Sequence, residues 1–423
     1  MKICVFGLWH LGTVTAACLA SGGHQVVGLD RDATVIANLK QGKPPVFEPG
    51  LAELISSTPL EFTTKREAAR NSEVVWVTFD TPVDEEDNAD IDFVIRQVEQ
   101  LFPCLSPGTL VLVSSQLPVG SVRRLEKFCP DKSISFAYSP ENLRLGKAIE
   151  VFTKPDRVIV GIRNERDKPR IEEIFRPWKP RIEWMSVESA EMTKHAINAF
   201  LATSVTFINE LAGICEQVGA DAKEVERGLK TESRIGPKAY LGPGAAFAGG
   251  TLARDIAFLT QIGGQHDVPI NLLSGVHDSN NAHKGWARRK LAERLGVLRG
   301  RRIAIWGLTY KPGTDTLRRS SSVELCEWLT IQGAHVQAHD PAVTALPPEL
   351  SDKMGLYPSA HDALSDAEAL VVATEWPDYR AIDAVTVVSA MKKPIVLDAG
   401  RFLTGTLGID GRIEYVAVGK PKS

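Results

Sequence analysis

The sequence predicts an α/β protein in which two doubly wound domains are joined by one long helix. Three observations carry this prediction. Short apolar runs alternate with helical stretches in both end regions. Residues 187–218 have a helical pattern with no proline and one glycine, and residues 302–308 (RIAIWGL) resemble residues 2–8 (KICVFGL). Strands alternating with helices form a parallel sheet covered on both faces, so each end region is expected to be Rossmann-like.

Length and composition limit the number of domains and the class of partner. A chain of 423 residues is expected to form two or three domains. We place an N-terminal domain at residues 1–185, a central helical domain at 186–290 and a C-terminal domain at 291–423. The formal net charge is −3, and basic residues are interspersed with acidic ones. This balance gives no indication of a nucleic-acid or membrane partner.

Targeting segments and metals are not expected either. The first residues form a strand pattern and lack the regions of a signal peptide. No apolar run reaches the roughly 18 residues that span a bilayer, so a cytoplasmic location is expected. No His or Cys cluster has metal-ligand spacing. The cysteines form no CxxC pair and should be reduced structural thiols: Cys4, Cys18, Cys104, Cys129, Cys215 and Cys326.

The first elements form a candidate dinucleotide-binding unit. Residues 2–6 and 25–29 are strand-like, residues 7–12 form a glycine-bounded turn, and residues 13–21 are helical in pattern. Gly7 and Gly12 would permit a tight turn beneath a pyrophosphate. Asp30, after the second strand, could accept hydrogen bonds from an adenosine ribose, which favours NAD over NADP.

Two residues near this turn leave alternatives open. Trp9 occupies the position of the middle glycine in a GxGxxG motif, so either its side chain points away or the pyrophosphate sits differently. A purely structural glycine turn is the competing interpretation. Arg31 could favour a phosphate, although such a side chain more often packs on adenine or faces solvent.

Later segments complete the two predicted sheets and the central helix. Strand patterns occur at residues 73–78, 110–114 and 157–161, and again at 302–308, 369–374 and 395–398. The second set also contains a strand that ends in an aspartate, Asp340. The long helix suits a spine between domains or subunits because apolar residues recur on it at helical spacing: Ile197, Phe200, Val205, Ile208, Leu211, Cys215 and Val218.

Six sequence blocks occur in the order typical of one enzyme family. They are PPVFEPGLAEL (44–54), Thr81-Pro82, SPENLRLGKAIEVFTKPDRVIVG (139–161), EMTKHAINAFLATSVTFINE (191–210), GLTYKPGTDTLRRS (307–320) and DAGR (398–401). With these blocks the chain resembles the UDP-glucose/GDP-mannose dehydrogenase family essentially from end to end. Those enzymes oxidise a primary alcohol of a nucleotide sugar to a carboxylate in two NAD-dependent steps.

The resemblance implies that the first domain holds NAD, the last holds the nucleotide, and the long helix forms a homodimer interface. It implies a catalytic set consisting of Glu141 as acid/base, Lys194 and Asn198 as oxyanion-stabilising groups, Asp255 behind the nucleophile position, and Thr251 at that position. The implied cofactor contacts are Gly7, Leu11, Gly12, Asp30, Thr81, Gln116, Arg254 and Arg318. The implied substrate contacts are Glu141, Leu143, Lys194, Asn198, Tyr240, Gly250, Lys311 and Arg401.

These roles are chemically reasonable for the residues themselves. Lys194 and Asn198 are spaced i, i+4, so both leave one face of the helix and could stabilise an alkoxide or a gem-diolate. The alternative is an ordinary polar stripe. Glu141, in a loop, could relay a proton through water, or could simply be solvated. Lys311 and Arg318 could bind an anion beyond a strand end, or be surface charges.

The chain departs from the family around the reacting carbon. The family motif FGGSC, followed two residues later by lysine and aspartate, reads here FAGGTLARD, with Thr251 for the nucleophilic cysteine and Arg254 for the lysine. A threonine hydroxyl needs a strong base to become a nucleophile, so Thr251 is expected to cap a helix or to hydrogen-bond the substrate. Gln116 replaces a threonine that helps hold a catalytic water, and Leu145 replaces a glutamate.

The sequence therefore favours an NAD-dependent nucleotide-sugar dehydrogenase acting on UDP-glucose or a close relative. Two versions are open: a complete four-electron oxidation by altered chemistry, or a two-electron oxidation that stops at the aldehyde. The alternative from another class is a non-catalytic nucleotide-sugar-binding protein that kept the fold.

Overall fold

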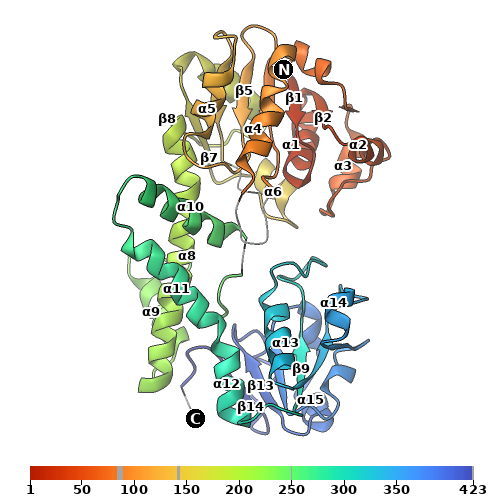
Figure 1. The fold of residues 1–423 in the computed structure, drawn as a ribbon, viewed down its shortest axis with the longest axis vertical. Helices are drawn as coiled ribbons and strands as arrows, with labels where there is room; N and C mark the ends of the chain where they lie inside the picture. Colours follow the sequence, from red (N-terminus) through yellow and green to blue (C-terminus); the bar gives the residue numbers. More distant parts are fainter. Residues whose placement is uncertain (83–88, 141–142, 249, 422–423) are drawn as a thin grey trace. The chain divides into compact units, whose positions relative to one another are not determined.

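The computed structural model describes residues 1–82, 89–140, 143–248 and 250–421. The chain divides into two compact units, Met1–Ile197 (unit 1) and Asn198–Ser423 (unit 2). The boundary falls inside helix α8 (Val187–Val218), which has the predicted bounds. The predicted fold class is confirmed, because two Rossmann-like sheets are joined through this helix (Figure 1).

Unit 1 contains an eight-stranded sheet in the order β3-β2-β1-β4-β5-β6-β7-β8. The strands are β1 (Lys2–Phe6), β2 (Gln25–Leu29), β3 (Leu60–Thr63), β4 (Val74–Val77), β5 (Leu110–Val113), β6 (Ser135–Tyr138), β7 (Val158–Ile162) and β8 (Ile182–Ser186). β7 pairs antiparallel with β6, so the expectation of a wholly parallel sheet was wrong. An antiparallel edge on a parallel sheet is common in doubly wound folds. The sheet also continues beyond β7, because β8 pairs with it in parallel.

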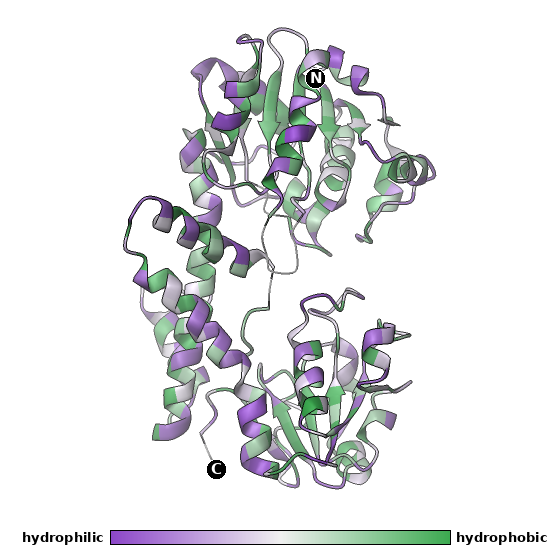
Figure 2. Ribbon diagram, in the orientation of Figure 1, coloured by the Kyte–Doolittle hydropathy of each residue, from purple (hydrophilic) through white to green (hydrophobic). Residues whose placement is uncertain are grey.

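Helices cover both faces of this sheet, and an apolar core lies on each face. They are α1 (His10–Ser21), α2 (Ala33–Lys40), α3 (Leu51–Ser57), α4 (Ile91–Glu99), α5 (Ser121–Phe128), α6 (Ala148–Thr153) and α7 (Lys168–Phe175). α1 begins at His10 rather than at Thr13 as predicted, because Trp9 is its N-cap. The strands are hydrophobic along their length, whereas the helices carry both polar and apolar residues (Figure 2). This is the pattern of a sheet buried on both sides.

Unit 2 combines the C-terminal part of α8, four shorter helices that precede the second sheet, and that sheet with its own flanking helices. The four preceding helices are α9 (Ala222–Thr231), α10 (Thr251–Gln265), α11 (Asn271–Lys284) and α12 (Trp286–Leu295). The sheet is parallel, in the order β11-β10-β9-β12-β13-β14. The strands are β9 (Arg302–Trp306), β10 (His335–His339), β11 (Gly355–Leu356), β12 (Ala369–Val372), β13 (Ile395–Asp398) and β14 (Glu414–Val416). The helices between them are α13 (Ser321–Ile331), α14 (Pro348–Ser351) and α15 (Ala384–Ala390).

The two sheets repeat one structural plan. The order β2-β1-β4-β5 in unit 1 corresponds to β10-β9-β12-β13 in unit 2. In each, a glycine with positive φ follows the first strand, Gly7 at +99° and Gly307 at +93°. The next backbone N–H donates to an aspartate, Leu8 to Asp30 at 2.6 Å and Leu308 to Asp340 at 2.7 Å. The copies differ in one respect: residues 7–9 join strand to helix in unit 1, whereas residues 307–320 do so in unit 2.

Helix α8 carries apolar residues on an exposed face as well as a buried one. In unit 2, its side chains Phe200, Phe207, Ile214 and Val218 are 48–70% exposed, and their spacing places them on one face. By length and composition alone α8 would also be apolar enough to cross a membrane, with a mean hydropathy of 1.3, which was not expected from the sequence. Half of that window is buried in the structure, as in core helices of other proteins.

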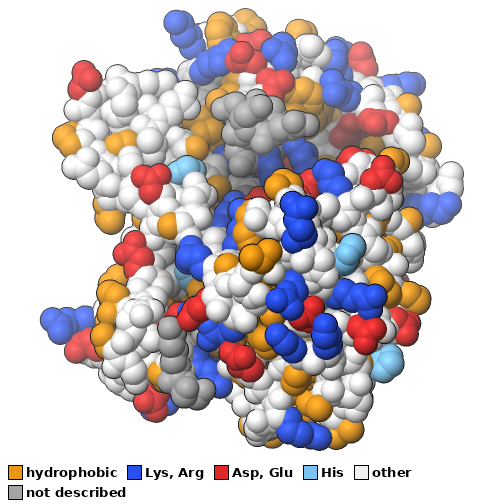
Figure 3. All heavy atoms as spheres, turned by 60° about the horizontal axis from the view of Figure 1, so that its bottom comes forward, with side chains coloured by type: hydrophobic (Ala, Val, Ile, Leu, Met, Phe, Trp, Pro, Cys, Tyr) orange, Lys and Arg blue, Asp and Glu red, His pale blue; other side chains and the backbone are white. Residues whose placement is uncertain are grey.

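Charges and thiols follow the composition. On the face shown in Figure 3, lysine and arginine side chains are interspersed with aspartate and glutamate. All six cysteines are free, and only Cys104 among them is partly exposed. Burial raises the pKa of the Cys4, Cys18 and Cys326 thiols to about 12. Within the described residues, no group of three or more His, Cys, Asp or Glu side chains could hold a metal ion.

Candidate active site

The turn after β1 is as tight as the sequence predicts. A Cβ on Gly12 would lie 1.7 Å from the carbonyl oxygen of Gly7, and one on Gly7 would lie 2.9 Å from the backbone nitrogen of Phe79. The Thr13 hydroxyl donates to the Leu8 carbonyl and the Thr78 hydroxyl to the Gly7 carbonyl, at 3.0 and 2.8 Å. Both glycines are therefore required by close backbone packing, and Gly12 already belongs to the first turn of α1.

Trp9 and Asp30 take defined positions at this turn. The Trp9 side chain is 50% exposed, so it does not fill the space beneath the turn. Asp30 is buried, and its two carboxylate oxygens accept the backbone N–H groups of Leu8 and Asp32 at 2.6 and 2.9 Å. Each oxygen keeps a second lone pair for a ribose hydroxyl. The Arg31 guanidinium lies over the Phe93 ring, 4.7 Å from its centroid.

We expect Asp30→Ala to weaken NAD binding by roughly tenfold or more, because it removes a charged acceptor and releases the Leu8 N–H. Wild-type protein should bind NADP far more weakly than NAD, since a 2′-phosphate would meet this carboxylate. Titration calorimetry with both cofactors measures each effect. Asp32→Ala is the matched control, because Asp32 only caps α2. Equal wild-type affinity for NAD and NADP would contradict the role of Asp30.

A second segment that is predicted to contact the cofactor is held by the beginning of α8. The Thr81 hydroxyl donates to the Gln116 carbonyl at 2.7 Å. His195 Nε2 lies 3.1 Å from the Leu117 carbonyl, and Glu191 accepts the N–H groups of residues 120 and 122 at 2.7 and 3.0 Å. Burial raises the pKa of the Glu191 carboxyl. The loop that bears Gln116 is thus fixed to the helical turn that bears Lys194, which is itself buried.

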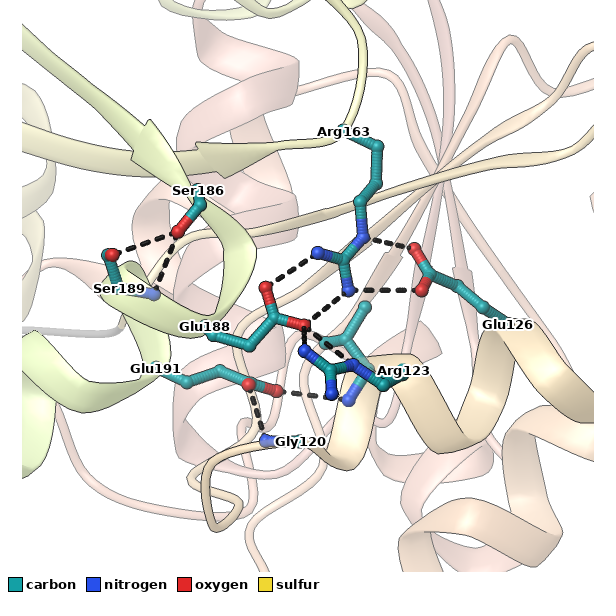
Figure 4. A network of polar contacts seen from close by, with 9 residues as sticks. Gly120, Arg123, Glu126, Arg163, Ser186, Glu188, Ser189 and Glu191 are labelled. Carbon is teal, nitrogen blue, oxygen red and sulfur yellow. Dashed lines mark hydrogen bonds and ion pairs between the residues drawn. The ribbon is translucent and has the colours of Figure 1, made fainter.

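An ion-pair network surrounds the start of α8 (Figure 4). Arg163 donates to both oxygens of Glu126 and of Glu188, at distances from 2.6 to 3.0 Å, and Arg123 also donates to Glu188. Hydrogen bonding from Arg163 lowers the pKa of Glu188 to about 2, and the same pairing raises the pKa of Arg163. The network joins α8, α5 and the end of β7.

The depressed pKa makes the stabilisation by Glu188 dependent on pH. It should be fully present above the unfolded-state value near 4.5 and should be lost as pH falls toward about 2. We expect Glu188→Gln to lower the free energy of unfolding by about 1–3 kcal/mol at pH 7, allowing for partial exposure. Urea unfolding at pH 7 and pH 3 measures the difference. Glu165→Gln, in an exposed pair with Lys168, is the control, and an equal deficit at both pH values would contradict this account.

Glu48 connects the start of α1 to the residues around Gly146. Its buried carboxylate lies 3.0 Å from His10 Nε2 at the start of α1, and it accepts the N–H groups of Gly146 and Ala148, both at 2.8 Å. Glu141 itself lies outside the described residues. Leu143 is partly buried against the core of unit 1, and Leu11 is buried within α1.

In unit 2, the residues predicted to act at the reacting carbon gather at the start of α10. Gly250, with φ +111°, is the N-cap, and Thr251 is the first helical residue and exposed. The prediction that Thr251 caps the helix was wrong, because Gly250 is the N-cap and Thr251 is already helical. One turn further, Asp255 is completely buried and accepts a hydrogen bond from the Asn198 side-chain amide.

The loop leading to α10 is held by buried amide side chains. Asn209 accepts the Gly244 N–H at 3.0 Å and donates to the Ala245 carbonyl at 3.3 Å. Asn280 makes both bonds with the backbone of Phe247, each 3.0 Å long. His283 Nε2 lies 2.8 Å from the Gly244 carbonyl, and burial lowers its pKa. This loop is therefore fixed from α8 and α11 together.

Of the other predicted contacts in unit 2, Lys311, Arg318 and Arg401 lie on two loops beyond strand ends, Tyr240 lies between α9 and α10, and Arg254 lies in α10. Lys311 follows β9, with its ammonium 5.5 Å from the centroid of the Tyr310 ring. Arg401 follows β13 and forms an ion pair with Asp221. Tyr240 is largely exposed, as is Arg318. Arg254, on the same turn of α10 as Asp255, donates its backbone N–H to the Gly250 carbonyl.

The sequence did not reveal the side chains that hold these loops, which are Glu48, Glu191, His195, Asn209, Asp221, Asn280 and His283. Several lie in the sequence blocks 44–54 and 191–210. For the residues on α8 and α11 the available signal was a polar residue on an otherwise apolar helix face, whereas Glu48 and Asp221 lie outside helices. That signal does not reveal which distant backbone group the residue meets.

Comparison with known proteins agrees with this geometry. Three models of the UDP-glucose/GDP-mannose dehydrogenase family match the chain: the NAD-binding domain at residues 1–179, the central domain at 188–282 and the UDP-binding domain at 304–405. UDP-glucose 6-dehydrogenase of Rhizobium meliloti is 33% identical over all of both chains. UDP-glucose 6-dehydrogenase TuaD of Bacillus subtilis is 32% identical over 99% of this chain and 93% of its own.

A solved structure gives the same result. A UDP-glucose dehydrogenase from the archaeon Pyrobaculum islandicum superposes with a TM-score of 0.87 at 28% identity, covering 100% of this chain and 98% of its own. The two sheets, the dinucleotide turn and the long helix define the class of NAD-dependent nucleotide-sugar dehydrogenases. The chain belongs to the UDP-glucose/GDP-mannose dehydrogenase family.

Proposed function

We propose that this protein is an active oxidoreductase that removes a hydride from C6 of UDP-glucose or a close relative and releases the aldehyde. The observation that carries the proposal is the buried pair of Asn198 and Asp255, in which Asp255 lies one helical turn after Thr251. Burying a carboxylate costs free energy unless it is hydrogen-bonded, and a protein that only binds ligand has no evident need for it. The relatives at 32–33% identity are UDP-glucose 6-dehydrogenases.

The residues of unit 1 suit NAD. The backbone packing leaves no room for a side chain at Gly7 or at Gly12, α1 begins between them at His10, and Trp9 does not fill the turn. Asp30 and Thr81 complete the proposed contacts. When bound, NAD accepts the hydride removed from the sugar alcohol.

The chain's own groups account for the remaining requirements of an alcohol oxidation. Glu141 takes the hydroxyl proton through water and passes it to solvent. Lys194 and Asn198, one turn apart on α8, stabilise the developing alkoxide. Asp255 holds the Asn198 amide in place by accepting its N–H.

Aldehyde release follows from Thr251. A second hydride can leave only from a tetrahedral adduct of the aldehyde, and an adduct to a side chain needs a strong nucleophile. Thr251 has a neutral hydroxyl at an exposed position, which is not acidic enough to attack unaided. The second oxidation would then depend on the free aldehyde hydrate.

A panel of UDP-sugars assayed with NAD, with NADH absorbance and product mass as readouts, tests the proposal. NADH formation with UDP-glucose or a close relative, and an aldehyde product, are expected. Tight binding of UDP-sugars without any NADH formation would instead support the non-catalytic binding protein.

Assembly is part of the proposal, because α8 exposes an apolar face in unit 2. Phe200, Phe207 and Ile214 recur every seventh residue on this face, the spacing of paired helices. We propose that it packs against a second copy of the chain. Phe207→Glu should convert a dimer into monomers in sedimentation at micromolar concentration, because it places charge in an apolar contact. Glu224→Gln, an exposed residue of α9 rather than of α8, is the control, and a wild-type monomer would contradict the proposal.

A further inference from the structure

Two loops of unit 2 that carry proposed substrate contacts lie side by side. A Cβ on Gly244 would be 3.5 Å from the Cα of Gly400, so the backbones of these loops are adjacent. Gly244 belongs to the segment that leads to Gly250, and Gly400 directly precedes Arg401. Neither loop belongs to α8, yet both are bonded to side chains at its C-terminal half or just beyond its end.

Asn209 supplies the first of these connections. It is 2% exposed, and its amide pairs with the Gly244 N–H and the Ala245 carbonyl at 3.0 and 3.3 Å. Both halves of the amide are thus used on one stretch of backbone. A side chain that meets a loop backbone in both senses fixes its orientation as well as its distance.

Asp221, which follows α8 and caps α9, supplies the second. Its oxygens lie 2.7 and 2.9 Å from Arg401 Nη1, and one of them also accepts the Lys223 N–H at 2.7 Å. Arg401 is held in a strained position, with φ +59°. The turn beneath it is fixed by buried Asp398, which accepts the N–H groups of residues 402 and 403 at 3.1 and 2.7 Å.

A third connection joins α8 to the end of the second sheet. Glu216 accepts the Gly419 N–H at 3.0 Å, and its other oxygen lies 2.6 Å from Lys290 Nζ. The Gly419 carbonyl accepts the Ala222 N–H at 2.9 Å. The chain after β14 is thereby hydrogen-bonded to both α8 and α9 at the point where these helices meet. The second sheet and the connection between α8 and α9 are thus held together.

We infer that Asn209 and Asp221 are positioning residues for the nucleotide of the substrate. They set the separation and orientation of the loop at Gly244 and the loop at Arg401, and so present the Arg401 guanidinium to an anionic diphosphate. This inference rests on the proposed function, in which unit 2 receives a UDP-sugar.

The test measures UDP binding to the full chain by calorimetry, with NAD binding measured on the same samples. Asn209→Ala and Asp221→Asn should each weaken UDP binding about tenfold, with NAD affinity unchanged. Asparagine is as good a helix cap as aspartate, so Asp221→Asn retains the start of α9 while removing the charge beside Arg401. Glu210→Ala and Glu224→Gln, exposed neighbours on α8 and α9, are the matched controls and should bind UDP normally.

The outcomes separate the inference from the proposed function. If wild-type protein and Arg401→Ala bind UDP equally weakly, the assignment of the UDP site fails. If Arg401→Ala weakens binding but Asn209→Ala and Asp221→Asn do not, the positioning inference is wrong. A parallel loss of NAD affinity in both variants would show a general structural role and also overturn it. A double variant that loses less than the product of the two single effects would support a shared arrangement of the loops.

Discussion

Wild-type protein is expected to form about one NADH per sugar consumed and to leave an aldehyde that hydroxylamine traps. The first oxidation needs a base, an oriented cofactor and a stabilised alkoxide, and none of these requires a thiol. The second needs a tetrahedral adduct. Thr251 is the first residue of α10 and has no activating base beside it on the helix except the carboxylate of Asp255, which already accepts a hydrogen bond from Asn198. Acid should therefore form much more slowly than aldehyde.

Thr251→Cys should increase acid formation. A cysteine at a helix N-terminus has a lowered pKa and a larger thiolate fraction, so it can add to the aldehyde and form a thiohemiacetal. Thr251→Ser is the matched control, because it keeps a hydroxyl at the same place and should behave as the wild type. The measurement is NADH per sugar with product mass. Two NADH per sugar at an undiminished rate, with no trapped aldehyde, would show that the wild-type site completes both steps without a thiol.

Lys194→Met should lower kcat by about 10²–10³-fold, the usual cost of removing a charged group that stabilises an oxyanion. Lys194 is buried on the turn of α8 that Glu191 and His195 fix to the Gln116 loop. Its ammonium therefore loses little freedom when an alkoxide forms nearby. Since the charge develops in the transition state, KM should change much less than kcat.

The control for this substitution is Lys127→Met, an exposed lysine on α5, which should leave kcat unchanged. Lys194→Arg should recover part of the activity, because it restores the charge with different geometry. If Lys194→Met raises KM alone and leaves kcat intact, the lysine acts only in binding, and the proposed alkoxide stabilisation is wrong.

Most of the fold could be predicted because its periodicity is local. β1, β2, β13 and α8 have the predicted bounds, since apolar runs and a long helical repeat are readable within one segment. The start of α1 was not predicted, because Trp9 caps the helix without a side-chain hydrogen bond. The antiparallel direction of β7 was not predicted either, because it depends on the path of the connection between β6 and β7 and not on the pattern of β7 itself.

The candidate site divides in the same way. Gly7, Gly12 and Asp30 could be predicted because strand, turn and second strand follow each other in sequence. The capping role expected for Thr251 was wrong, because Gly250 adopts a positive φ that ends the loop there. Glu191 and Asn280 were not predicted, because each bonds to backbone that lies far away in the sequence.

The unequal connections of the two repeated units bear on how such a protein can change its ligands. In unit 1 the helix starts directly after residues 7–9, so an anion there would meet main-chain amides, which no substitution of a side chain removes. In unit 2 residues 307–320 intervene and bring Lys311 and Arg318. On the proposed function, exchanges around Lys311 would alter contacts to the sugar nucleotide, whereas the main-chain amides of the turn at Gly7 would stay as they are. Side-chain exchanges would then reach the ligand more readily in the second half of the chain than in the first.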